Sequence, residues 1–148
     1  MNETELHYYC APAGDLTVDL PIEFVPVQDF LADEIACKAL WELISTNFRT
    51  RSKFLTVWPN VRFVAVHYGP DKTVAGLLLV TAPINWQIDY VVVSPSARGR
   101  GVGAALVKAT LNEAFHRNVP YVMLTSRESL RPLYEGCGFS VVNAPALV

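Results

Sequence analysis

Glycine and arginine residues that could bind phosphate follow a run of valines in the second half of the chain. Residues 91–93 are all valine, and this β-branched run predicts the end of a buried strand. Residues 98–104 read Arg-Gly-Arg-Gly-Val-Gly-Ala and lead into a helix-favouring segment. Glycines allow backbone N–H groups to approach a ligand, and the start of a helix adds unpaired N–H groups and the positive end of its dipole. With two arginine charges, the pattern predicts a phosphate site.

The same glycines could belong to a nucleotide-binding fold. Gly99, Gly101 and Ala104 satisfy the spacing of the dinucleotide-binding fingerprint. That fold needs a tight turn, an acid at the end of the next strand and further β-α-β units. Here five residues separate Val93 from Gly99, the next apolar strand ends in Thr-Ser, and little chain follows. A P-loop is disfavoured because no Gly-Lys-Ser/Thr follows the glycines.

A second motif lies downstream, where residues 133–139 read Leu-Tyr-Glu-Gly-Cys-Gly-Phe. Arg98-x-x-Gly101-x-Gly103, preceded by Val-x-Pro, resembles the acyl-CoA-binding motif of the GNAT superfamily of N-acyltransferases. The stretch from Tyr134 to Phe139 is similar to that family's Tyr-x-x-x-Gly-Phe signature. The two motifs stand in the family's order, and the resemblance covers residues 75–142.

The resemblance implies an N-acetyltransferase that uses acetyl-CoA as co-substrate and transfers its acetyl group to a primary amine by direct attack in a ternary complex. The tyrosine at the position of Tyr134 protonates the departing sulfur in such enzymes, and a phenol pKa near 10 suits that leaving group. Backbone groups of the valine strand would hold the thioester and pantetheine arm, and the glycine loop the pyrophosphate. The implied cofactor-binding residues are Val91, Val92, Val93, Arg98, Gly99, Arg100, Gly101, Val102, Gly103 and Ala104.

The general base is poorly marked. The match places Gln87 where many relatives carry a glutamate, and an amide cannot accept a proton at neutral pH. Asp89 lies two residues further along, on the same face of the strand, so it is predicted to be the base or the anchor of the amine. A structural Asp89, with water carrying the proton, is the alternative. The missing glutamate also leaves open a catalytically inactive acyl-CoA-binding sensor or partner domain.

Composition limits the class of protein. A chain of 148 residues, with 51% hydrophobic and 18% charged residues, predicts a single domain over residues 1–148. The net charge of −2 argues against a nucleic-acid binder, and no apolar run is long enough for a bilayer. The irregular spacing of Cys10, Cys37 and Cys137 predicts neither a disulfide framework nor a zinc site, and no metal is expected.

The acidic N-terminus is unlike a signal peptide, so a cytoplasmic location is expected. The expected partners are acetyl-CoA and an amine that the sequence does not identify. Neither nucleic acid nor a membrane is expected, and a homodimer stays open.

The spacing of apolar residues predicts the helices and strands that must position these motifs. The β-α-β unit around the glycine loop should be parallel. With the resemblance, the fold class is α/β (α+β): a three-layer αβα domain around a central mixed, mostly antiparallel sheet. The expected elements are an extended arm over 1–15, an edge strand or two pieces over 16–27, a helix over 29–48 capped by Asp29, strands over 61–68, 73–81 and 86–93, a helix over 101–117, a strand over 120–125, a short helix over 129–135 and a strand over 139–142.

Overall fold

A seven-stranded sheet organises the protein, with the strand order β2-β3-β4-β5-β6-β1-β7. The computed structural model describes residues 4–48, 51–82 and 85–142. Within these residues, β5 and β6 form the only parallel pair. The strands are β1 (Glu5–Cys10), β2 (Glu23–Pro26), β3 (Val61–Tyr68), β4 (Val74–Thr81), β5 (Trp86–Val93), β6 (Val122–Arg127) and β7 (Ser140–Val142).

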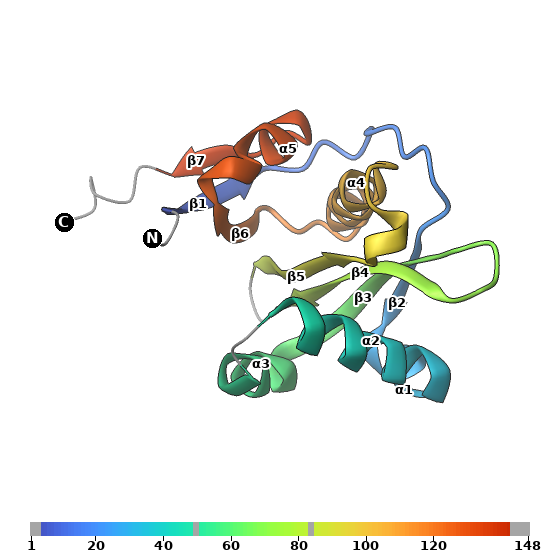
Figure 1. Ribbon diagram of the computed structural model, residues 1–148. Helices are drawn as coiled ribbons and strands as arrows, with labels where there is room; N and C mark the ends of the chain where they lie inside the picture. The colour runs from blue at the N-terminus through green and yellow to red at the C-terminus, as the bar shows by residue number, and fades with distance from the viewer. Residues whose placement is uncertain (1–3, 49–50, 83–84, 143–148) are drawn as a thin grey trace.

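Helices cover both faces of the sheet. Helices α1 to α3 lie on one face, over the half made by β2 to β5, and α4 and α5 lie on the other (Figure 1). This arrangement confirms the predicted three-layer fold with a mixed, mostly antiparallel sheet. The helices are α1 (Val27–Leu31), α2 (Glu34–Asn47), α3 (Arg51–Val57), α4 (Val102–His116) and α5 (Arg131–Gly136), with short 3-10 turns at Trp58–Asn60, Pro95–Ala97 and Glu128–Leu130.

Strand β4 separates two hydrophobic cores. Its residues Leu77 and Leu79 pack under α2, whereas Leu78 and Val80 pack under α4, and all four are fully buried. A strand buried on both faces reads as a continuous apolar run rather than an alternation. Burying each of these side chains stabilises the fold by about 1.5–3 kcal/mol. The neighbouring strand β5 is therefore held against a rigid support.

The predicted arm over residues 1–15 is wrong for its middle part. Residues 5–10 form β1, which pairs antiparallel with β6 on one side and β7 on the other. Tyr8 is only 1% exposed, and its ring centroid lies 5.3 Å from that of Tyr134. His7 and Tyr9 point to the opposite, exposed face. Burial of the alternate side chains explains why this segment is a strand of the sheet.

The helix predicted over residues 29–48 is divided. Its first part is α1, and α2 begins at Glu34 after Asp33. The carboxylate of Asp33 accepts hydrogen bonds from the backbone N–H groups of Ile35 and Ala36, at 3.0 and 3.1 Å. The N-cap is thus Asp33 rather than Asp29, because an N-cap carboxylate satisfies donors that the helix itself leaves unpaired.

The strands and helix that flank the glycine loop agree closely with their prediction. Strand β5 covers residues 86–93 as expected, and α4 differs from the predicted 101–117 by one residue at each end. The pairing of β5 with β6 confirms the parallel β-α-β unit.

Candidate active site

A wedge opens between the two parallel strands. Within the described residues, the ladder between β5 and β6 contains the pairs Trp86–Val122 and Gln87–Met123 and then stops. Beyond it, β5 stays paired with β4, and β6 stays paired with β1 as far as Arg127. The two strands therefore diverge toward their C-terminal ends. Backbone groups along the inner walls are available to a ligand lying in this wedge.

A β-bulge shapes the wall made by β5. Leu79 pairs with Asp89 and Leu77 with Val92, so β5 carries one extra residue between these pairs. Tyr90 lies in the bulge with φ of 58°, a left-handed conformation that is unusual for an aromatic residue. Such strain costs on the order of 1–3 kcal/mol and is common at functional sites.

Aromatic packing holds Tyr90 in place. The rings of Phe48 and Phe54 meet its ring edge-on, with centroids 4.8 and 5.7 Å away. Burial raises the pKa of the Tyr90 phenol, and the charge of Asp89 raises it further. The bulge is thus fixed from the side of α2 and α3.

The glycine loop lies beyond the C-terminal end of β5. Gly99 and Gly101 have φ of 79° and 78°, and a Cβ atom at either position would meet no heavy atom within 4 Å. Gly101 is the N-cap of α4, with no side chain capping the first turn. The first N–H groups of α4 thus remain for a ligand, and a helix N-terminus favours an anion. Because open space adjoins these donors, the loop fits a pyrophosphate.

Arg98 makes specific contacts at the end of the wedge. Its Nη2 donates to Oδ1 of Asn47 at 2.7 Å, and its Nε donates to the carbonyl of Val93 at 3.2 Å. The side chain therefore links the end of α2 to the end of β5, and it is exposed like Arg100. Both arginines keep a positive charge beside the glycine loop.

The predicted valines divide between the two cores. Val91 and Val93 pack toward α4, whereas Val92 packs toward α2. In the first turns of α4, Val102 is buried, and Gly103 and Ala104 are half-buried. These residues line the same end of the wedge as the loop.

Tyr134 lies behind the wall made by β6. It comes from α5, is 4% exposed, and packs between Tyr8 and Phe139. Burial raises the pKa of its phenol, and a hydrogen bond with Ser126 lowers it in part. Ser126 lies three residues beyond Met123, the last residue of β6 that pairs with β5. The hydrogen bond with Ser126 therefore places the Tyr134 hydroxyl beside the part of β6 that no longer pairs with β5.

Asp89 lies on the opposite face of the sheet from α4. Its Oδ2 accepts a hydrogen bond from the Thr81 hydroxyl at 3.0 Å, and its Oδ1 accepts one from the Gln87 amide at 3.1 Å. The predicted common face of Gln87 and Asp89 is confirmed, because the bulge comes after Asp89. Both carboxylate oxygens thus have donors, which suits a fixed negative charge better than a proton acceptor.

A pocket of about 310 Å³ lies on this face across β5, β6, β1 and β7. Its lining includes Gln87 and Thr125, and also His7, which the sequence prediction had assigned to an arm. The alternation of polar and apolar residues in Glu-Leu-His-Tyr-Tyr-Cys could have revealed the strand that carries it.

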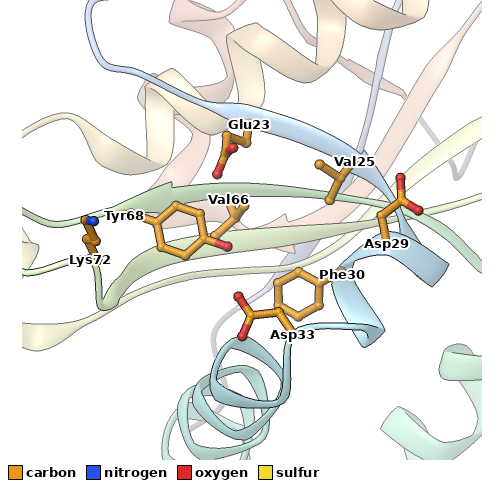
Figure 2. A pocket seen from close by; sticks show the side chains of 8 residues that line it. All are labelled: Glu23, Val25, Asp29, Phe30, Asp33, Val66, Tyr68 and Lys72. Atoms are coloured by element: carbon orange, nitrogen blue, oxygen red, sulfur yellow. The ribbon is translucent and has the colours of Figure 1, made fainter.

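A larger pocket, of about 480 Å³, lies elsewhere, between β2, β3 and the start of α2 (Figure 2). It contains the carboxylates of Glu23, Asp29 and Asp33 with Lys72. Burial raises the pKa of the Tyr68 phenol there, and Glu23 and Asp33 raise it further. None of the predicted site residues lines this pocket, and Asp33 already caps α2. The wedge is therefore the candidate active site.

Other chemistries find little support in the described part of the chain. Residues 4–48, 51–82 and 85–142 hold no cluster of three or more His, Cys, Asp or Glu side chains suited to a metal ion. Cys137 is 2% exposed, and burial raises the pKa of its thiol, which disfavours the reactive thiolate. The described helices include none with the length and apolar character needed to cross a bilayer.

Comparisons with known proteins agree with this geometry. A model of the acetyltransferase (GNAT) family matches residues 29–139. The comparison with curated proteins found no match.

Solved structures share the fold. A GNAT-family protein from Novosphingobium aromaticivorans matches with a TM-score of 0.67 at 20% identity, over 96% of this chain and 61% of its own. A GCN5-related N-acetyltransferase from Sphaerobacter thermophilus gives 0.66 at 19% identity, over 93% of this chain and 48% of its own. A predicted acetyltransferase from Clostridium acetobutylicum, solved with acetyl-CoA, gives 0.57 at 15% identity, over 83% and 91%. The chain thus spans less than two thirds of the first two proteins, and identities this low show the fold alone.

Proposed function

Because this chain belongs to the GNAT family of acetyltransferases, we propose that it transfers an acetyl group from acetyl-CoA to a primary amine by direct attack in a ternary complex. The observation that carries the proposal is the wedge between β5 and β6, which opens beside a glycine loop at the start of α4. A ligand with a pyrophosphate at one end and a thin arm at the other fits this combination. The structure from Clostridium acetobutylicum solved with acetyl-CoA supports the same choice of ligand.

Each part of the wedge has a proposed role. The loop from Gly99 to Ala104 binds the pyrophosphate through backbone N–H groups, and Arg98 and Arg100 add positive charge. Backbone groups of Val91 to Val93, next to the bulge, hold the thioester carbonyl and the pantetheine arm.

The reacting groups approach from two faces. Tyr134 donates a proton to the departing sulfur from the side of α5, because its raised pKa keeps the phenol protonated at neutral pH. Asp89 lies on the other face, where its charge attracts the ammonium form of the amine. The ammonium group then loses a proton, the neutral nitrogen bonds to the acetyl carbon, and the carbon–sulfur bond breaks as the nitrogen loses its second proton.

The direct test combines binding with turnover. Calorimetry measures acetyl-CoA affinity, and a thiol reagent follows CoA release with a panel of amino acids, alkylamines, polyamines and peptides. Release that requires an amine supports the enzyme. Binding without release across the panel supports the sensor, which the amide at Gln87 in place of a carboxylate favours.

Asp89→Asn is expected to raise KM for the amine about tenfold and to change kcat little. The neutral amide keeps the size of the side chain but removes its charge, and a hydrogen bond to a charged group contributes about 1.5–3 kcal/mol. Steady-state kinetics with the amine varied measure the effect. The same change at the exposed Asp15 is the control. An unchanged KM would make Asp89 structural, and a lost acidic limb of the pH profile would make it the base.

Cys137→Ala is expected to keep kcat within about twofold of the unmodified protein. Direct transfer needs no acyl-enzyme, and the raised pKa of this buried thiol suppresses its thiolate. Kinetics with both substrates varied should give intersecting lines. Parallel lines, together with an inactive variant that still folds, would instead indicate an acetylated cysteine.

A further inference from the structure

The pocket on the open face of the sheet has a mainly apolar lining. It lies at the point where β5 and β6 cease to pair, since Gln87 and Met123 form the last pair of their ladder. Among residues 4–48, 51–82 and 85–142, no Asp, Glu, Lys or Arg side chain lines it. The lining residues are His7, Tyr8, Gln87, Met123, Leu124, Thr125 and Val142. At about 310 Å³, the pocket is at the small end of the range for ligand sites.

One nitrogen of His7 is held by a neighbouring strand. Nδ1 lies 3.1 Å from the hydroxyl oxygen of Thr125. When Nδ1 carries its proton and donates it to this oxygen, the lone pair of the ring is on Nε2. Thr125 therefore orients the imidazole, and in this tautomer Nε2 is the nitrogen that accepts a proton.

Strand register brings His7 beside the wedge. His7 pairs with Thr125, which is two residues beyond Met123 on β6. Neighbouring strands lie about 5 Å apart, so His7 lies one strand beyond β6, the wall of the wedge that faces the valines proposed to hold the thioester. Gln87, Thr125 and His7 share the same face because side chains alternate along each strand.

We propose that this pocket binds the acceptor as a primary amine with a compact apolar body, and that Nε2 of His7 accepts the proton of the attacking amine. This inference rests on the proposed acetyl transfer and assigns its missing base. Asp89 attracts the ammonium group from the opposite wall, while the apolar lining excludes acceptors with a second charge.

The transfer balances as follows. The ammonium group first releases one proton to solvent. The neutral nitrogen then forms a bond with the acetyl carbon and loses its second proton to Nε2 of His7. The carbon–sulfur bond breaks, and the sulfur takes a proton from the hydroxyl of Tyr134. The products are an N-acetyl amine and CoA, and the proton then passes from the imidazolium through solvent to restore both residues.

Other titratable groups share this face with His7. The imidazole must be neutral to accept a proton, so we expect kcat to fall at acidic pH. Strand β7 contributes no titratable side chain, because its residues are Ser140–Val142. The groups on the facing strands are Glu5 and Tyr9 of β1, Arg127 of β6 and Asp89 of β5.

His7→Gln is expected to lower kcat about 100-fold at pH 7 and to remove the acidic limb of the kcat profile, because the amide keeps polarity without basicity. The probes are acetyl-CoA and n-pentylamine, with CoA release as the readout. His116→Gln is the matched control, because His116 is exposed at the end of α4. Thermal unfolding verifies that the variants fold, and acetyl-CoA affinity should not change.

Two results distinguish a failure of the role proposed for His7 from a failure of the proposed acetyl transfer. If the unmodified protein releases no CoA with any amine, acetyl transfer and the role of His7 are both overturned. If it turns over and His7→Gln keeps both the rate and the acidic limb, the role of His7 alone is overturned.

A matched pair of amines tests the acceptor class. n-Pentylamine is expected to exceed 1,5-diaminopentane in kcat/KM at least tenfold, because the second ammonium of the diamine would have to enter an apolar lining. Equal values, or a preference for the diamine, would overturn the assignment of this pocket to an apolar amine.

Discussion

Tyr134→Phe is expected to lower kcat by about 10²–10⁴-fold while acetyl-CoA still binds, because loss of a general acid typically costs that much. The variant removes one oxygen atom and retains the ring that packs against Tyr8 and Phe139. Single-turnover kinetics with acetyl-CoA and a reactive amine measure the chemical step.

The pH dependence gives a second measure of Tyr134. Burial raises the pKa of its phenol, so the hydroxyl keeps its proton up to a pH above the ordinary phenol value of about 10. We expect the alkaline limb assigned to this group to lie above that value and to vanish in the phenylalanine variant. Ser126→Ala, which removes the bonded hydroxyl, is the control and should have a smaller effect. An unchanged kcat in Tyr134→Phe would show that this tyrosine only packs.

Gly103→Val is expected to weaken acetyl-CoA binding roughly 100-fold. The added side chain would occupy the space beside the first turn of α4 and deny the phosphates one or two hydrogen bonds, each contributing about 1.5–3 kcal/mol. A Cβ atom at Gly103 would lie 3.8 Å from Val93, so the fold accepts it. Gly101→Val is a poorer test, since φ of 78° strains any other residue there. Calorimetric titration gives the affinity.

Gly136→Val provides the comparison. A Cβ atom at that position meets no heavy atom within 4 Å, and the residue lies in α5 rather than at the start of α4. Equal acetyl-CoA affinities for the two variants would disprove phosphate binding at the glycine loop.

Much of the fold could be predicted because the patterns are local. Strand β4 is almost entirely apolar, β3 and β5 each contain a run of four apolar or aromatic residues, and the glycine loop fixes where α4 begins. The errors arose where tertiary packing decides. Nothing local distinguishes Asp29 from Asp33 as a helix cap. The alternation over residues 5–10 is short, and the place of β1 between β6 and β7 depends on pairing with distant segments.

The candidate site likewise contains residues that local sequence patterns predict and residues whose positions depend on tertiary packing. The glycine loop and Tyr134 are contiguous motifs, so their positions could be predicted from the sequence. The common face of Gln87 and Asp89 followed from alternation, but the bulge at Tyr90 depends on rings from Phe48 and Phe54 and could not be placed. His7 was missed because its neighbour Thr125 is 118 residues away in the chain.

The position of β1 has a consequence for the order in which the protein is assembled. During synthesis, this strand leaves the ribosome long before β6, so the pairing of β1 with β6 must wait until the intervening residues emerge. Pairings between distant segments form slowly, because closure of a long loop costs entropy before any contact stabilises it. The half of the sheet made by β2 to β5 can fold first, around α2. We therefore expect the wall of the wedge made by β6, and with it ligand binding, to be completed only when β1 pairs with β6 late in folding.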